Sequence, residues 1–295
     1  MKETKLGYAK KSLGQNFLHE ETALKKIVDA GNLSKKDTVL EIGPGRGALT
    51  KKLLETGATV IAVEKDRELI PYLSELFAKE LKKKQLVLIE ADILDFDISD
   101  YGLKTKDPTR TTGVVQSGGY KLIANIPYYI TGAIVRKFLS ARAQPSTMVI
   151  LVQDEVARRI TTMNPPQHQG KPAPVKESLL SLSVKAYGTP RYVAKVSRGS
   201  FTPAPKVDSA ILAIEHISKG FFGKTKVGET EKLFFELLHA GFAHKRKVLL
   251  GNLKQYNKKG NLEAIFAELG LTKNTRAEDV PLDTWSLLCK RLQTR

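Results

Sequence analysis

The chain has 295 residues, 41% hydrophobic and 27% charged, a balance typical of one large globular domain or of a large and a small one. It has no run of about 18 apolar residues, one cysteine, and no apolar stretch after its first lysines, which argues against a membrane-spanning, disulfide-bonded or secreted protein and favours a cytoplasmic one. The net charge of +17, spread along the chain, favours a polyanionic partner, although attraction to a membrane surface or simple solubility would fit as well.

From residue 38 onward the sequence alternates short apolar segments with helical patterns. Strands are predicted at residues 39–42, 59–63, 86–89, 120–124 and 148–152, with helices at 48–56 and from about 67 to 83. Such alternation indicates an α/β fold in which a parallel sheet is covered by helices on both faces. Two later strands are expected at residues 192–196 and 210–215.

The last part of the chain changes to a purely helical pattern. Three apolar helix faces are predicted, namely Leu233, Phe234, Leu237, Leu238 and Phe242, then Leu262, Ile265, Phe266 and Leu269, then Trp285, Leu288 and Leu292. Because the Gly- and Lys-rich residues 218–228 look like a linker, we predict a larger domain over 1–217 and a small all-α domain over 218–295. Residues 104–119 and 171–174 are expected to form loops.

A glycine-rich turn follows the first strand of this pattern. Gly43 and Gly45 separate the strand from a helix, and glycine lets the backbone pass close to a bound nucleotide. Glu64 ends the next strand, where a carboxylate can accept hydrogen bonds from both ribose hydroxyls. Together with Ala48 the glycines also fit the G-x-G-x-x-A fingerprint of NAD-binding proteins, so an oxidoreductase is an open alternative here.

Two further features at the same sheet edge favour a base-binding site. Asp92 comes just after the third strand, where a short carboxylate can reach the exocyclic amine of an adenine, although an N-cap or turn would also explain it. Asn125-Ile126-Pro127-Tyr128 ends the fourth strand and is expected beside Gly43. Hydride transfer has no need of that tetrapeptide, and no His or Lys is evidently placed to protonate a carbonyl.

The tetrapeptide suits the methylation of an aromatic amine. Because the N6 lone pair of adenine is delocalised into the ring, acceptors for both N–H groups help it to react, and the Asn125 oxygen and the Ile126 carbonyl are the candidates. Pro127 stiffens the turn and Tyr128 offers a face for base stacking. A sulfonium donor leaves as a neutral thioether, so positioning dominates the chemistry. A buried Asn turn with a core Tyr is the alternative interpretation.

An adenine in folded RNA must be flipped out before it can enter such a pocket. A second aromatic ring would then hold the opposite face of the base, and Phe201 is the candidate. The prolines at 203 and 205 are expected to prevent regular structure and to present the ring at the pocket mouth. A phenylalanine of the hydrophobic core is the alternative.

Four sequence blocks, in this order, resemble the ribosomal RNA adenine N6,N6-dimethyltransferase family. They are LGQNFL at 13–18, EIGPG at 41–45, NIPY at 125–128 and FTPAPKVDS at 201–209, and the resemblance extends from Lys11 to Leu292. It implies a Rossmann-like class I methyltransferase sheet, S-adenosyl-L-methionine as cofactor, and a helical C-terminal domain that docks the ribosomal particle. The implied activity converts two adjacent adenines near the 3′ end of small-subunit (16S) rRNA to N6,N6-dimethyladenine, with a role in small-subunit biogenesis.

The resemblance also implies roles for individual residues. The implied cofactor contacts are Asn16, Leu18, Gly43, Glu64, Asp92 and Asn125, with Gly45 in the same turn, and residues 15–18 would form a lid. The implied base-handling residues are Asn125, Ile126, Pro127, Tyr128 and Phe201. The basic cluster Lys245, Arg246 and Lys247 is interpreted as a contact with RNA phosphates, with a solvated helix face as the alternative. The histidines show no ligand spacing, so we assign no metal, and we expect a monomer.

Two alternatives with the same fold stay open. The Erm branch methylates large-subunit RNA, but residues 201–209 and Arg276-Ala277-Glu278 favour the small-subunit branch. The other alternative is a non-catalytic ribosome-assembly or transcription factor, against which the intact NIPY block argues. Tyr129 stands where Asn or His is more usual, and residues 104–119 and 165–176 also depart from the pattern, so the RNA contacts are open.

Overall fold

The computed structural model describes residues 9–98, 119–161, 167–168, 171–172, 176–244, 246–257 and 260–293. They belong to two compact units, one drawn from Met1–Ala157 with Pro190–Ile217 and the other from Arg158–Thr189 with Ser218–Arg295. One border therefore follows residue 217, whereas residues 158–189 group with the C-terminal helices. Residues 104–118 of the first predicted loop and residues 173–174 of the second lie outside the described residues.

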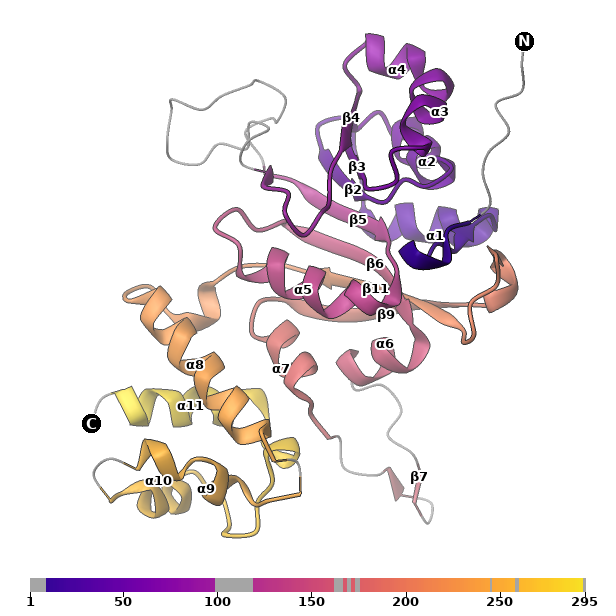
Figure 1. Cartoon of the computed structure of the whole chain (residues 1–295). Helices are drawn as coiled ribbons and strands as arrows, with labels where there is room; N and C mark the ends of the chain where they lie inside the picture. The colour runs from indigo at the N-terminus through magenta and orange to yellow at the C-terminus, as the bar shows by residue number, and fades with distance from the viewer. Residues whose placement is uncertain are drawn as a thin grey trace. The chain divides into compact units, whose positions relative to one another are not determined.

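A seven-stranded sheet forms the centre of the first unit (Figure 1). Its strands are β2 (Thr38–Ile42), β3 (Thr59–Glu64), β4 (Leu86–Glu90), β5 (Lys121–Asn125), β6 (Thr147–Gln153), β9 (Thr189–Val196) and β11 (Ser209–Glu215), in the order β4-β3-β2-β5-β6-β11-β9. The five strands β4, β3, β2, β5 and β6 run parallel to one another. Because β11 runs antiparallel to β6, the sheet is mixed. The strand order reverses between β2 and β5, the kind of point where open α/β sheets bind ligands.

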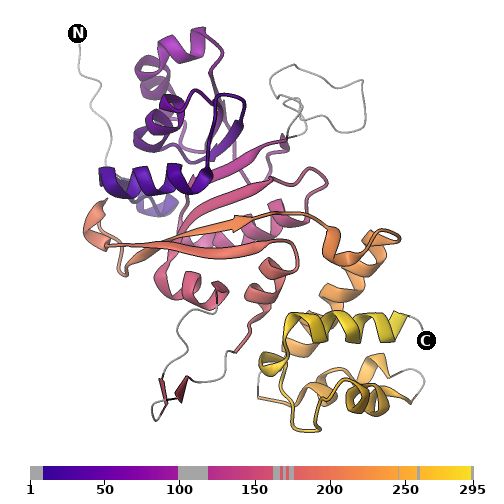
Figure 2. The same cartoon turned by 180° about the vertical axis from the view of Figure 1, so that it is seen from behind.

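Burial on both faces explains the almost continuous apolar sequence of the central strands. All of Thr38–Ile42 is buried, and β6 is buried at each position except its two ends. Helix α5 (Thr131–Ser140) lies in front of the sheet in Figure 1, and α1 (Glu21–Gly31) lies in front of it in the reverse view of Figure 2. Neither helix was predicted from the sequence pattern.

The other helices of this unit lie between the strands in the chain. They are α2 (Ala48–Glu55), α3 (Leu69–Leu76), α4 (Ala78–Lys82) and the start of α6 (Asp154–Thr161). The single helix predicted over about 67–83 is thus two helices. At Phe77 the backbone leaves the helical region, with φ −110° and ψ 27°, and its buried ring packs against Gly47.

The second unit is built from helices, together with the short strand pair β7 (Gln167–His168) and β8 (Lys171–Pro172). Its helices are α7 (Leu179–Lys185), α8 (Val227–Phe242), α9 (Leu249–Asn252), α10 (Leu262–Glu268) and α11 (Leu282–Gln293). The three predicted apolar faces are confirmed by the burial of Phe234, Ile265 and Trp285. The expectation of an unpaired loop at 171–172 is wrong, because these residues pair with β7.

The stretch expected to be a linker, 218–228, has structure of its own. Gly220–Phe222 form a 3-10 helix, and Phe222 is buried. The Phe222 ring centre lies 5.7 Å from that of Phe234 and 5.3 Å from that of Tyr187. Burial of these aromatic rings holds the stretch against α8. Its glycines and lysines suggested a linker because composition does not show this packing.

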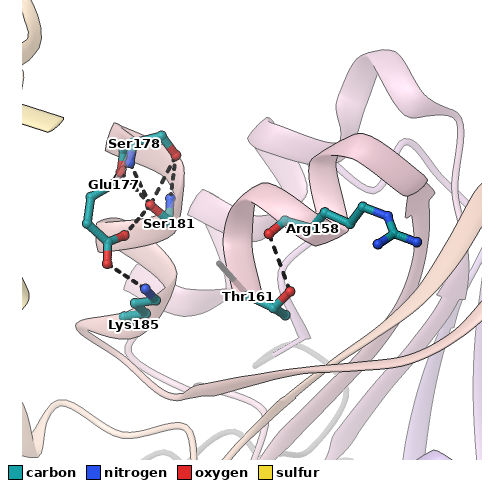
Figure 3. A network of polar contacts seen from close by, with 6 residues as sticks. All are labelled: Arg158, Thr161, Glu177, Ser178, Ser181 and Lys185. Carbon is teal, nitrogen blue, oxygen red and sulfur yellow. Dashed lines mark hydrogen bonds and ion pairs between the residues drawn. The ribbon is translucent and has the colours of Figure 1, made fainter. Parts of the chain in front are cut away.

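Helix α7 begins at a capping box, which Figure 3 shows from close by. The Ser178 hydroxyl accepts from the Ser181 backbone N–H at 3.0 Å, and the Ser181 hydroxyl accepts from the Ser178 backbone N–H at 2.7 Å. Glu177 accepts from the Ser181 hydroxyl and from Lys185, both at 2.6 Å. These bonds satisfy the first turn of the helix, so the network has a structural role.

Candidate active site

A pocket opens at the carboxyl ends of β2 and β5, where the strand order reverses. Its walls come from segments far apart in the sequence: the N-terminal segment, the glycine turn, the ends of β3 and β4, and the tetrapeptide after β5. The pocket is lined by Asn16, Leu18, Gly43, Gly45, Glu64, Asp92, Asn125, Ile126, Pro127, Tyr128 and Phe201, among others. The structure therefore brings together every residue that the sequence analysis singled out for the cofactor and the base.

The glycine turn adopts a backbone conformation that other residues rarely take. Gly43 and Gly45 have φ of 66° and 58°, in the left-handed region. The Gly43 N–H donates to the Val63 carbonyl at 2.9 Å, which ties the turn to the end of β3. A Cβ atom on Gly45 would lie 3.0 Å from Cδ1 of Phe17, so glycine allows the N-terminal segment to approach the turn closely.

Glu64 is a buried carboxylate at the end of β3, with a side chain held by two backbone donors. Oε1 accepts from the Asp66 N–H at 2.8 Å and Oε2 from the Gly45 N–H at 3.1 Å. Burial raises the pKa of Glu64, and the backbone hydrogen bonds oppose that effect. Since a carboxylate has about four lone-pair sites, Glu64 keeps the capacity to accept a hydrogen bond from a ligand.

Asp92 is both a turn residue and a wall of the pocket. Oδ1 accepts from the Leu94 N–H at 2.9 Å, as the turn interpretation expects, and Oδ2 pairs with the Lys65 ammonium at 2.6 Å. The hydrogen bond from Lys65 is the main reason why the pKa of Asp92 is lowered. The carboxylate is thus charged and lines the same pocket as the glycine turn.

The tetrapeptide begins at the last residue of β5. The Asn125 side-chain nitrogen Nδ2 donates to the Asn16 carbonyl at 3.2 Å, so Oδ1 is the part of the amide that can accept from a bound amine. Ile126 is buried, and the Pro127 carbonyl accepts from the Ile130 N–H at 3.2 Å. This bond starts the short 3-10 helix η3 (Tyr128–Ile130).

The two aromatic residues of the proposed base site are held in different ways. The half-buried Tyr128 shares a hydrogen bond with the Ser209 hydroxyl at 2.5 Å, and burial is the main cause of the raised pKa of Tyr128. Phe201 is 4% exposed and belongs to the hydrophobic core, and it also lines the pocket. The expectation of irregular structure at this position is wrong, because β10 (Phe201–Thr202) pairs antiparallel with β1 (Phe17–Leu18).

Asp66 is a residue of this region that sequence reasoning missed. Its Oδ1 accepts from Lys10 at 2.7 Å and its Oδ2 from Gln15 at 2.9 Å, while its own N–H donates to Glu64. Burial works against the charge of Asp66, but the hydrogen bonds from Lys10 and Gln15 outweigh it and lower its pKa. Asp66 therefore joins the N-terminal segment to the carboxylate of Glu64, and its place two residues after Glu64 was the available signal.

The basic cluster lies in the turn between α8 and α9. Arg246 and Lys247 are exposed, and Lys245 lies outside the described residues. Their exposure agrees with the alternative of a solvated face, but the two residues do not lie on a helix, because α8 ends at Phe242 and α9 begins at Leu249. The Lys247 N–H donates to the His244 carbonyl at 2.9 Å, which closes the turn.

Comparison with known families decides which class of protein builds this pocket. The family described as ribosomal RNA adenine dimethylase matches residues 7–294. The chain belongs to this family. It is 40% identical over 295 residues to ribosomal RNA small subunit methyltransferase A of Dehalococcoides mccartyi strain CBDB1, covering 98% of this chain and 91% of that one. It is 34% identical over 280 residues to the protein of the same name from Clostridium botulinum strain Kyoto, covering 94% and 92%.

Two solved structures share the fold of the family. A dimethyladenosine transferase from Plasmodium falciparum aligns with a TM-score of 0.71 at 23% identity, over 94% of this chain and 98% of that one. The 23S rRNA methyltransferase ErmE aligns with a TM-score of 0.69 at 24% identity, over 94% and 100%. The predicted family, enzyme class and class I methyltransferase fold are confirmed. The match of Gly43, Gly45 and Ala48 to the NAD fingerprint therefore does not reflect the function.

Proposed function

We propose that the protein transfers methyl groups from S-adenosylmethionine to N6 of two adjacent adenines near the 3′ end of small-subunit rRNA, giving N6,N6-dimethyladenine. The observation that carries the proposal is the meeting of Glu64, Asp92 and residues 125–128 in one pocket. The names of the relatives from Dehalococcoides and Clostridium support the small subunit as the substrate.

The proposed setting is the cytoplasm, where a monomer meets the small ribosomal subunit or its precursor and contributes to subunit biogenesis. The net charge of +17 supports an RNA partner. Within the described part of the chain, no helix has the length and apolar character needed to cross a membrane. The exposed Arg246 and Lys247 of the small helical domain are the proposed phosphate contacts, together with Lys245.

The pocket fits the methyl donor in the chemistry of its side chains. Glu64 is a buried carboxylate with lone pairs available for the two ribose hydroxyls, and Asp92 is an acceptor for the adenine amine. Gly43 and Gly45 keep the backbone of the turn free of side chains, and Asn16 and Leu18 also line the pocket. When bound, S-adenosylmethionine supplies an electrophilic methyl carbon on a sulfonium.

The residues after β5 handle the target base. The Asn125 Oδ1 atom and the Ile126 carbonyl accept the N–H groups of the N6 amine, which counters the loss of electron density to the ring. The aromatic faces of Tyr128 and Phe201 hold the base, and Pro127 keeps the turn rigid. The methylated amine is acidic enough to lose its proton to water, so these residues act by positioning and by their dipoles.

A labelled-methyl assay on both ribosomal subunits tests this function. Purified protein and labelled S-adenosylmethionine should label immature small subunits that lack the methyl groups, in the form of N6,N6-dimethyladenine. Label found only in large-subunit RNA would assign the protein to the Erm activity instead. Tight RNA binding without any label would support a non-catalytic assembly factor.

A further inference from the structure

Tyr129 is an aromatic residue at the pocket that neither the cofactor nor the target base accounts for. Its side chain is 69% exposed, more than any other large hydrophobic side chain in the described ranges. It nevertheless lines the same pocket as Asn125 and Tyr128. Exposing a large ring costs hydrophobic free energy, and a ring exposed at the rim of a binding pocket is typical of a contact surface.

The ring of Tyr129 is held in place although it is exposed. A Cβ atom on Gly14 would lie 3.1 Å from Cε1 of Tyr129 and 3.2 Å from Cβ of Pro127, so the bare backbone of Gly14 supports one side of the ring. Gly14 has φ of 62°, which also favours glycine. A ring that is already restrained loses little conformational entropy when a ligand stacks on it.

Tyr129 and Tyr128 point in different directions. Both belong to the 3-10 helix η3, in which successive side chains are about 120° apart. Tyr128 is half-buried and bonded to Ser209, whereas Tyr129 is turned to solvent. The two rings therefore do not hold the same base, and Tyr129 is available for a different nucleotide.

Two exposed cationic residues also line this pocket. The Lys65 ammonium pairs with Asp92 at 2.6 Å at this edge, and the Arg46 guanidinium carbon lies 4.7 Å from the centre of the Phe17 ring. Aromatic faces beside positive side chains are what proteins use to bind single-stranded nucleic acid, with bases on the rings and phosphates near the cations.

We propose that Tyr129 is a positioning residue on which the nucleotide next to the target adenine stacks. The inference rests on the proposed function, because it requires a flipped-out adenine in the neighbouring pocket. Stacking of the flanking nucleotide holds the strand at the rim while the target base is bound inside. The contact needs an aromatic face and not the phenol hydroxyl.

Steady-state methylation of unmethylated small subunits tests the proposal. Tyr129→Leu should raise KM for the particle about tenfold, as expected for loss of one base–aromatic stack, with kcat changed by less than about twofold. Tyr129→Phe should restore the wild-type KM. Leu76→Ala is the matched control, since Leu76 is 50% exposed and is not a pocket residue, and it should leave KM unchanged.

Three results would overturn the proposal: an unchanged KM in Tyr129→Leu, an equal defect in Tyr129→Phe, or weakened binding of S-adenosylmethionine alone by Tyr129→Leu.

A second measurement separates this proposal from the proposed function. Fluorescence polarisation of a labelled, adenine-containing single-stranded RNA should show weaker binding by Tyr129→Leu and normal binding by Tyr129→Phe. If the wild type fails to methylate small subunits but Tyr129→Leu still binds the RNA more weakly than Tyr129→Phe, the substrate assignment fails and the stacking role stands. If the difference is absent, the stacking role fails.

Discussion

Asn125 is the proposed acceptor for the amine, and a hydrogen bond orients its side chain. Its Nδ2 is engaged by the Asn16 carbonyl at 3.2 Å, which orients the amide with Oδ1 as the remaining acceptor. We expect Asn125→Ala to lower kcat by roughly 100-fold or more, the scale seen when a positioned polar group is removed from an active site. The fold should be intact, since the β5 ladder is formed by backbone groups. The labelled-methyl assay measures turnover, and thermal unfolding checks the fold.

Asn32→Gly is the control for this variant. Asn32 ends α1 in the left-handed conformation with φ of 45°, which glycine adopts readily, and it is not a pocket residue. It should retain full activity. Near-normal turnover of Asn125→Ala would contradict the proposed role of the amide oxygen.

Glu41 is a buried polar residue of β2, and its environment has a measurable consequence. It is 1% exposed, and within the described residues neither carboxylate oxygen has a hydrogen bond of normal geometry. Burial raises the pKa of Glu41 to about 8, with Thr50 close enough to oppose the effect in part. The folded protein therefore keeps this carboxyl protonated at pH values where the unfolded chain has lost the proton.

The sign of the pH effect follows from proton counting. Between about pH 4.5 and pH 8 the folded state binds more protons than the unfolded state, so this group makes the free energy of unfolding fall as pH rises. The full effect is roughly 5 kcal/mol, at about 1.4 kcal/mol for each unit of pKa difference. Glu41→Gln mimics the neutral form. The free energy of unfolding of this variant, measured with urea, should therefore fall less steeply with rising pH over this range. Equal slopes in both proteins would exclude Glu41 as the titrating group.

At the scale of elements, the position of residues 15–18 at the pocket depends on pairings that no local pattern reveals. Sequence periodicity predicted β2 to β6 to within a residue or two, because each is a short, mainly apolar run. It gave no role to residues 15–18, whose position depends on β1 pairing with β10 and on Asp66 binding Lys10 and Gln15. Two-residue strands have no period to detect, so only the resemblance pointed to this segment.

The turn between α8 and α9 leads to a prediction about RNA binding. Replacing Lys245, Arg246 and Lys247 by Ala should weaken RNA binding and reduce the slope of log K against log salt by about 1 for each phosphate that is no longer neutralised. The matched control replaces Lys79, Lys82 and Lys83, which are exposed at α4, by Ala. Binding titrations at several salt concentrations measure both slopes. Equal slopes for the two triple variants would mean that the turn contributes to RNA binding only through its general positive charge.

At the scale of the whole molecule, the division into two units can be probed with the single tryptophan. Trp285 lies fully buried on α11 in the second unit, whereas the pocket belongs to the first. S-adenosylmethionine at 100 times its Kd should stabilise the first unit by about 2.7 kcal/mol. We therefore expect it to raise the unfolding midpoint followed by circular dichroism but not the midpoint followed by Trp285 fluorescence.

Glu64→Gln is the control for this experiment, since loss of the proposed ribose acceptor should reduce the ligand-dependent shift. Coincident shifts of both signals in the wild type would mean that the two units unfold as one cooperative body. Separate shifts would establish that each unit folds on its own core, as the buried aromatic cluster around Phe222 and Phe234 suggests for the second.

The sequence by itself determined the parallel strands, the glycine turn, Glu64, Asp92 and the tetrapeptide after β5, because burial on both faces and the demands of nucleotide binding leave a local signature. Only the tertiary structure decided that β11 is antiparallel, that Phe201 sits in a strand opposite Leu18, and that Asp66 holds the N-terminal segment. These features arise from contacts between residues distant in the chain, and pairing partners at such separations are not encoded in any local periodicity.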